Sequence, residues 1–359
     1  MVAAASKASI SMPGRLRVRS LPVEQWSPAD TVAWAVACRP SQRLIRGGAG
    51  AHMKPITLSD LARRYGYFLD FLDRTAGLDG NAKPAGQVTP GNVARCIEEL
   101  RARVSSVTTY GSIYKLRRAS QLLDPSGDFG WLIELEKDLA LVMQPRSKAG
   151  QFVLSEVLVE CGLILMTEAD DSVTLSRLAK ARQFRNGLMV AMLALHPIRL
   201  KNFAGLTIGH DFVEIDDQWW IVLSSTATKE ARSDERRIDE TIATALGTYL
   251  NKHRPVLARE SDKSGALWVS SINGQPMTYR SVAGAIEGTT RSTIGVGISP
   301  HMFRTSAASS AAVHAGHNPH LASALLHHRD NRVTEEHYNR ASSLSAANAF
   351  GKLIKKVIA

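Results

Sequence analysis

Apolar residues recur at three- and four-residue spacing along most of this chain, and the spacing changes to alternation chiefly between residues 212 and 238. The helical period runs through about 55–145 and 152–195. In the alternating region, short runs of β-branched and aromatic residues flank the turn Asp216-Asp217-Gln218. A brief strand at 267–270 and further helices follow, at 279–288, 301–315, 319–327 and 342–358. The pattern predicts a mainly α fold with a small antiparallel β-sheet, in the α+β class.

Composition divides the chain into three segments. Residues 1–50 are predicted to be a basic N-terminal extension with one short helix, because the first 20 residues carry four cations and no acid. Residues 51–145 are predicted to be a helical unit in which Thr57 caps one helix and Thr89-Pro90 begins another. The polar stretch 144–150 is expected to be a linker, so that 146–359 form a second domain with a tail helix.

Within the second domain, one proline marks an expected helix end. The apolar period that begins at Thr241 continues to Arg254, and Pro255 follows. Proline has no backbone N–H and clashes with the preceding turn, so we expect the helix to stop there.

The charge balance points to a polyanionic partner. Lys and Arg number 44 and Asp and Glu number 33, which gives a formal net charge of +11. Basic domains gain affinity for nucleic acids because neutralised phosphates release counterions. Cys38, Cys96 and Cys161 are too widely spaced for a disulfide framework or a metal site, which suits a reducing cytosol. No apolar run reaches the roughly 18–20 residues of a membrane span, so we expect a cytoplasmic protein without membrane contact.

Candidate catalytic residues lie in the second domain. The chain has no Gly-rich phosphate loop and no zinc-protease, serine-hydrolase or CxxC motif. His301 and Arg304 are three residues apart, a spacing that places both on one face of a helix. Alone, an Arg or Lys is usually a solvated surface charge, a His near an apolar helix is more often structural, and a Tyr on a helix is more often a half-buried packing residue. Any functional assignment therefore depends on the whole ordered set, which is Arg199, Lys229, His301, Arg304, His328 and Tyr338.

Taken in order, these residues resemble the motifs of the tyrosine recombinases of the phage integrase family, over about Leu58 to Tyr338. The matching segments are His196-Pro197-Ile198-Arg199-Leu200 with Leu206-Thr207, the hairpin lysine Lys229, the His-x-x-Arg box His301-Met302-Phe303-Arg304, the third box Leu326-His327-His328, and the nucleophile position Tyr338. Two positions depart from the family pattern. Asn202 stands where an acid is common, and His327 stands where the third box has Gly.

The resemblance implies a reaction at a phosphodiester. Arg199 and Arg304 would hold the two non-bridging oxygens, because each guanidinium offers paired planar donors and stays ionised. A tyrosine hydroxyl, whose ordinary pKa is about 10, would be the nucleophile and must lose its proton during attack.

The other positions supply proton transfer and charge stabilisation under this interpretation. Tyr338 would attack with His301 as the assisting base, Lys229 would protonate the leaving 5′-oxygen, and His328 would donate a hydrogen bond in the transition state. The 3′-phosphotyrosine product retains the energy of the broken bond, so we expect no ATP, no metal and no other cofactor.

The resemblance also implies a clamp around double-stranded DNA and a homo- or hetero-tetramer on the recombination site. The helix expected at 107–123 carries Lys115, Arg117 and Arg118 and is predicted to face DNA. The chain is therefore interpreted as a site-specific DNA recombinase of the integrase type, which includes the integrases and transposon recombinases of mobile elements and the dimer resolvases; DNA integration, excision and dimer resolution all stay open as its role. Two alternatives stay open: a catalytically inactive DNA-binding relative, and an enzyme resembling type IB topoisomerases.

Overall fold

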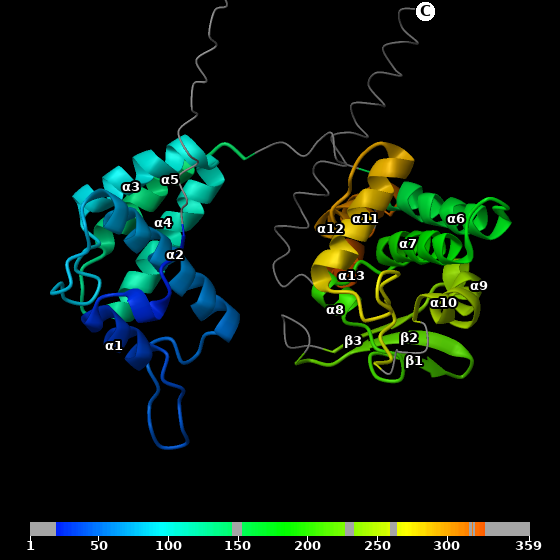
Figure 1. The fold of residues 1–359 in the computed structure, drawn as a ribbon, viewed down its shortest axis with the longest axis horizontal. Coiled ribbons are helices and arrows are strands. Elements are labelled where there is room, and N and C mark those ends of the chain that lie inside the picture. Colours follow the sequence, from blue (N-terminus) through cyan, green and yellow to red (C-terminus); the bar gives the residue numbers. More distant parts are fainter. Residues whose placement is uncertain are drawn as a thin grey trace, which may run out of the picture. The chain divides into compact units, whose positions relative to one another are not determined.

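The computed structural model describes residues 19–145, 153–226, 233–258, 264–315, 318 and 320–326. The chain divides into two compact units, Met1–Ser147 and Lys148–Ala359, each with its own hydrophobic core (Figure 1). The described residues are mainly helical, and the second unit contains a small antiparallel sheet. The predicted fold class is confirmed.

Every helix or strand named in the described part of the first unit is a helix. Its elements are η1 (Val23–Gln25), α1 (Pro28–Ala37), α2 (Pro55–Thr75), α3 (Pro90–Arg103), α4 (Ser106–Leu123) and α5 (Gly130–Leu141). The expected start of α3 is confirmed: the Thr89 hydroxyl accepts from the Asn92 N–H, and Pro90 takes the first helical position. The start of α2 is earlier than predicted. Pro55 rather than Thr57 begins the helix, because its fixed φ already suits the first turn.

The segment around α1 belongs to the core of this unit, in contrast to the extension expected for residues 1–50. Leu21, Trp26 and Trp34 are buried, and Trp26 packs edge-on against Tyr65 with ring centroids 4.8 Å apart. The buried Asp30 carboxylate accepts hydrogen bonds from the Tyr65 hydroxyl at 2.9 Å and from a backbone N–H at 2.8 Å. These bonds offset the cost of removing the carboxylate from water. The prediction rested on the cations of the first 20 residues, whereas the large aromatic side chains of Trp26 and Trp34 decide the burial of this segment.

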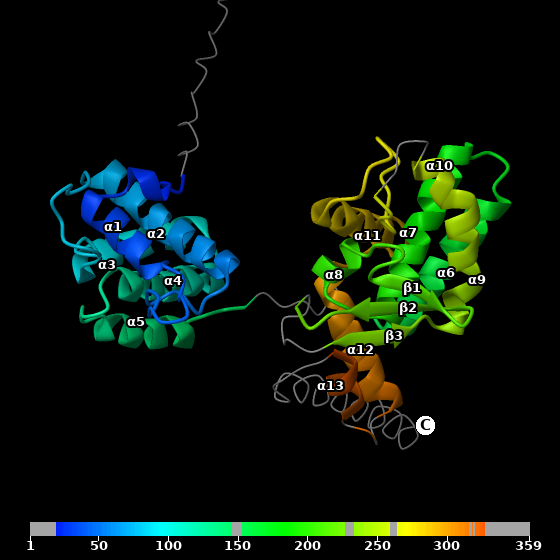
Figure 2. The same ribbon diagram turned by 90° about the horizontal axis from the view of Figure 1, so that it is seen from below.

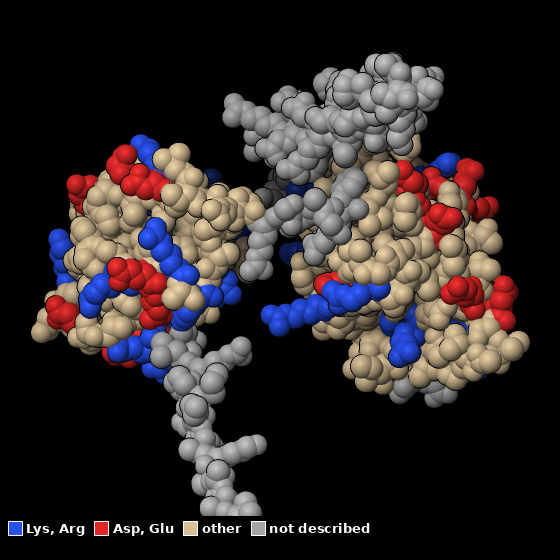
Figure 3. Space-filling view, turned by 90° about the horizontal axis from the view of Figure 1, so that it is seen from above, with Lys and Arg blue, Asp and Glu red and all other residues tan. Residues whose placement is uncertain are grey.

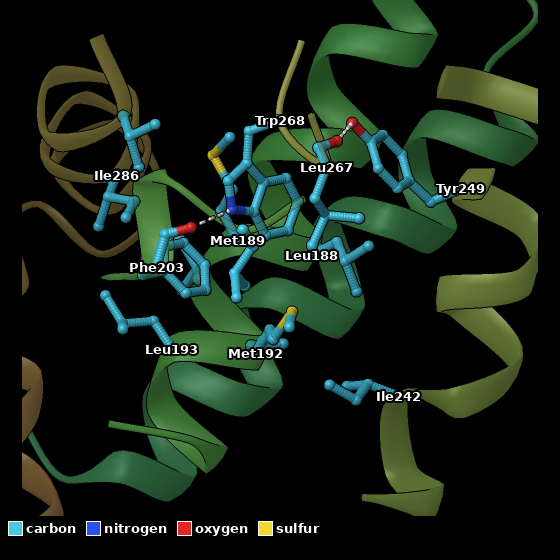
Figure 4. Packing of buried hydrophobic residues seen from close by; sticks show 14 of the residues in the cluster. Leu188, Met189, Met192, Leu193, Phe203, Ile242, Tyr249, Leu267, Trp268 and Ile286 are labelled. Carbon is cyan, nitrogen blue, oxygen red and sulfur yellow. Dashed lines mark hydrogen bonds between the residues drawn. The ribbon is translucent and has the colours of Figure 1, made fainter. Parts of the chain in front are cut away.

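The second unit is built around a central buried helix, α7. Its helices are α6 (Ser155–Asp171), α7 (Arg177–Leu195), α8 (Leu200–Ala204), α9 (Glu240–Thr248), α10 (Arg254–Ala258), α11 (Tyr279–Ile294), α12 (Pro300–His314) and α13 (His320–Leu326). Leu188, Met189 and Met192 of α7 belong to the same buried hydrophobic cluster as Trp268 (Figure 4). Gly162 on α6 lets the two backbones touch, since a Cβ there would lie 2.5 Å from the Gly187 carbonyl oxygen.

The sheet has the strand order β1-β2-β3, with β1 (Phe212–Ile215), β2 (Gln218–Leu223) and β3 (Asp234–Arg237) all antiparallel. The expected turn is a two-residue hairpin in which Asp216 and Asp217 have φ of 50° and 58°. Such turns require positive φ at both positions, which Asp tolerates better than most residues. The strand expected at 267–270 is reduced to single bridges, one of them between Val269 and Pro276.

The helix expected to stop at Pro255 continues past it. After α9 the backbone forms a π-turn (Tyr249–His253), and the Arg254 N–H donates to the Tyr249 carbonyl five residues earlier. The wider turn shifts the hydrogen-bond register just before the residue that lacks an N–H, so α10 follows without a break. The aromatic ring of Tyr249 is buried and its hydroxyl donates to the Leu267 carbonyl (Figure 4).

Candidate active site

Arg199 lies between the central helix α7 and the short helix α8. The chain leaves α7 at Leu195, passes through the buried residues His196 to Ile198, and places Arg199 as the residue that precedes the first turn of α8. Phe203, one turn further, is fully buried, and its carbonyl accepts from the Trp268 indole at 2.8 Å (Figure 4). The backbone on both sides of Arg199 is therefore anchored in the core, while its own side chain is half-buried.

His301 and Arg304 lie on the first turns of α12. Pro300 takes the first helical position, and the buried side chains of Met302 and Phe303 fix which face of the helix turns to the core. His301 is consequently exposed and Arg304 half-buried. The predicted sharing of one helix face follows from their three-residue spacing.

The Arg304 guanidinium joins two segments that are far apart in the sequence. Its Nη1 donates to the Pro197 carbonyl oxygen and its Nη2 to the Leu326 carbonyl oxygen, each at 2.6 Å. Pro197 lies two residues before Arg199, and Leu326 is the last residue of α13. Arg304, in the His-x-x-Arg box, therefore bonds to the segment just before Arg199 and to Leu326, the first residue of the third box.

Lys229, His328 and Tyr338 lie outside the described residues, and so does His327. Asn202 lies within α8, where its backbone N–H donates to the Arg199 carbonyl at 2.9 Å. Of the six predicted catalytic residues, the structure thus places Arg199, His301 and Arg304.

Sequence reasoning assigned no role to three polar residues beside these motifs: His196, Asp234 and Arg236. Burial, with Arg236 as a lesser cause, lowers the pKa of His196 to about 4, so the ring is neutral near pH 7. Its Nε2 accepts from the Asp239 N–H at 3.3 Å, which joins the end of α7 to the start of α9. The signal in the sequence that could have identified Asp234 and Arg236 was the alternation of strand positions. These two residues share the less exposed face of β3, while Glu235 and Arg237 are exposed.

The three cations predicted to face DNA lie on α4, and two of them are bonded to carboxylates. Arg117 donates to both oxygens of Glu136, at 2.6 and 3.1 Å, which raises the pKa of the guanidinium. Lys115 pairs with Asp60, and Arg118 donates to the Tyr114 hydroxyl at 3.1 Å. Figure 3 shows Lys and Arg interspersed with Asp and Glu on one face of this unit.

A second group of cations lies on the loop between α1 and α2. We call residues 39–46 the arginine loop; it extends away from the helices and closes with a bridge between Gln42 and Ile45 (Figure 1). Arg39, Arg43 and Arg46 are all exposed, and none of them takes part in an ion pair or side-chain hydrogen bond in the part of the chain that the structure describes. No acid occurs between residues 30 and 60, so this loop has an uncompensated positive charge.

The described residues lack two kinds of feature. They contain no group of three or more His, Cys, Asp or Glu side chains placed to hold a metal ion. None of their helices is long and apolar enough to cross a membrane.

Comparison with known proteins agrees with the motif geometry. A profile of the Phage integrase family matches residues 165–344, which includes every motif segment from α7 to Tyr338. The chain therefore belongs to the phage integrase family of tyrosine recombinases, and this membership implies site-specific recombination of DNA. No curated protein sequence matches the chain.

Two solved recombinase structures are similar to this chain at low sequence identity. The chain is similar to the XerH site-specific recombinase bound to difH substrate in a pre-cleavage complex, with a TM-score of 0.55 and 14% identity, over 90% of this chain and 98% of that one. A crystal structure of XerA recombinase matches with a TM-score of 0.41 and 18% identity, over 84% of this chain and 94% of that one.

The two carbonyl bonds of Arg304 generate a prediction. Arg304→Lys keeps the positive charge but loses the planar fork that reaches Pro197 and Leu326 together. We expect covalent DNA cleavage to fall by about 10²–10³-fold, the scale for one lost transition-state donor. Single-turnover adduct formation measures the rate, and thermal unfolding and DNA affinity are the controls. Near-normal cleavage would show that Arg304 does not act at the phosphate.

Proposed function

We propose that this protein is a site-specific DNA recombinase that cuts and rejoins DNA through a 3′-phosphotyrosine. The observation that supports this most directly is the pair of Arg304 bonds to Pro197 and Leu326, because they join three motif segments at one place. Arg199 lies two residues after Pro197, and His301 lies three residues before Arg304. They would supply a second guanidinium and an exposed imidazole to a phosphate there.

The proposed reaction exchanges one phosphate ester for another. The Tyr338 oxygen forms a bond to phosphorus while the bond from phosphorus to the 5′-oxygen breaks, with Arg199 and Arg304 on the non-bridging oxygens. His301 assists removal of the phenolic proton, His328 donates a hydrogen bond to the transition state, and the leaving oxygen takes its proton from Lys229. Attack by the free 5′-hydroxyl of another strand reverses the steps, so the proposed reaction consumes no ATP and requires no metal ion.

The proposed partner is a double-stranded recombination site, on which four identical or paralogous protomers assemble. The arginine loop and α4 are the cationic surfaces of the first unit. The loop keeps three uncompensated charges, whereas two of the three α4 cations are bonded to carboxylates. We expect the loop to make more phosphate contacts, because an ion-paired cation must give up its partner to neutralise a phosphate.

The nucleophile is tested by removing one oxygen atom. Tyr338→Phe should abolish covalent attachment to DNA while leaving DNA affinity almost unchanged. A nicked substrate that traps the covalent product, resolved on a denaturing gel, measures attachment. Tyr279→Phe, at an exposed tyrosine on α11, is the matched control and should react like the unaltered protein.

The outcomes of this trapping experiment separate the alternative functions. A persistent adduct in Tyr338→Phe would mean that another tyrosine attacks. Specific DNA binding with no adduct in the unaltered protein would identify an inactive DNA-binding relative. Relaxation of supercoiled DNA without exchange between two sites would identify a topoisomerase.

The cationic surfaces are tested by the salt dependence of DNA binding. Each phosphate contact adds roughly 0.9 to the slope of log affinity against log salt. Replacing Arg39, Arg43 and Arg46 together by Gln should lower this slope by roughly 2–3 on any DNA sequence. The matched triple change of Lys115, Arg117 and Arg118 to Ala should lower it by about 1. Equal slopes for the loop variant and the unaltered protein would show that the loop does not contact phosphates.

A further inference from the structure

A second arginine reaches α13 from the β-sheet. On β3, Arg236 donates from Nε and Nη2 to the two carboxylate oxygens of Asp234, at 2.7 and 2.9 Å. Its Nη2 also donates to the Leu325 carbonyl oxygen at 2.9 Å. Both charged side chains are nearly buried, with 10% and 11% of their surface exposed. Figure 2 shows β3 next to α12 and α13.

The end of α13 is consequently held from two sides. The last carbonyls of any helix have no partner within the helix, and they form the negative end of its dipole. Here Leu325 accepts from Arg236 and Leu326 accepts from Arg304. One guanidinium comes from the sheet and the other from α12, so the last turn of a seven-residue helix is fixed against both elements.

The Asp234 carboxylate holds the Arg236 guanidinium in its orientation. A two-point bond to a carboxylate fixes the plane of a guanidinium as well as its position. Asp234 precedes Arg236 by two residues on the same strand face, so the pair moves with β3 as one unit. The buried ring of His196 lies close enough for Arg236 to lower its pKa, which places this pair beside the first motif segment as well.

We infer that Arg236, held by Asp234, is a positioning residue that fixes the last turn of α13, at which the third box begins. His328 lies two residues after Leu326, and two residues span at most about 7 Å of chain. Under this inference, a displacement of the last turn of α13 also displaces His328, the proposed transition-state donor. The inference rests on the proposed function for the role of His328, and on the described bonds for the anchoring of α13.

Two measurements test separately the anchoring of α13 by Arg236 and the effect of that anchoring on His328. In the first, hydrogen exchange of the amides at 321–326 is compared between Arg236→Gln and Arg237→Gln. Arg237 is the neighbouring, exposed arginine of the same strand and pairs only with Glu240 among described carboxylates, so it is a matched control. We expect faster exchange in α13 for Arg236→Gln alone. Equal exchange in the two variants would overturn the anchoring.

The second measurement is a double-mutant cycle on the rate of covalent DNA cleavage. Arg236→Gln should lower the rate by about 10–10²-fold, as a misplacement of the order of 1 Å does, with DNA affinity unchanged. If Arg236 acts through His328, the double variant Arg236→Gln with His328→Ala should be no slower than His328→Ala alone. Multiplying losses would overturn the positioning role.

A second variant separates positioning from loss of folding. Arg236→Gln removes the guanidinium that donates to both oxygens of the buried Asp234 carboxylate, which destabilises a protein for reasons unrelated to α13. Asp234→Asn combined with Arg236→Gln removes both charges and should show the same rate loss and the same faster exchange. Recovery of the normal rate in this pair would overturn the inference. If the unaltered protein forms no adduct, the proposed function fails, while the exchange measurement still decides whether Arg236 anchors α13.

Discussion

The Arg304 guanidinium between two backbone carbonyls is the contact on which the arrangement of the motifs depends. Pro197 and Leu326 are 129 residues apart in the chain, and a single planar group bonds to both. Hydrogen bonds from charged donors contribute about 1.5–3 kcal/mol each, more than bonds between neutral groups. A lysine has all its N–H donors on one atom, so it lacks the planar fork with which the guanidinium reaches the two carbonyls. The same side chain that the family resemblance assigns to a phosphate is thus also a connector of the fold.

The hydrophobic core of the second unit holds in place the segment to which the Arg304 guanidinium bonds. Helix α7 is buried along most of its length, and the residues that follow it, up to Ile198, remain buried. Trp268 ties the backbone of α8 to the core through its bond to the Phe203 carbonyl. The segment before Arg199 is therefore a fixed reference, to which Arg304 attaches α12 and α13, while Arg236 attaches α13 to the sheet.

Local features of this chain were predictable from sequence because they depend on neighbouring residues. Thr89-Pro90 marks a helix start, and Asp216-Asp217 marks a tight hairpin, through bonds and dihedral angles within a few residues. The carboxylates that bond to the cations of α4, and the α13 carbonyl that Arg236 reaches, could not be foreseen. Glu136 lies 19 residues from Arg117, and nothing in the alternation of β3 indicates that Arg236 bonds to a carbonyl 89 residues away. Lys229, His328 and Tyr338 are assigned by the order of the motifs, and their roles stay predictions.

The most direct test of the account is to identify the residue that becomes attached to DNA. Trypsin cuts after Arg332 and Arg340, so Tyr338 lies in the peptide 333–340, which contains no other tyrosine. After trapping on a nicked substrate and digestion with nuclease and trypsin, mass spectrometry should find this peptide carrying a 3′-linked phosphonucleotide on Tyr338. A nucleotide on any other peptide, or a reaction product without attached protein, would contradict the assignment of this chain as a recombinase that acts through Tyr338.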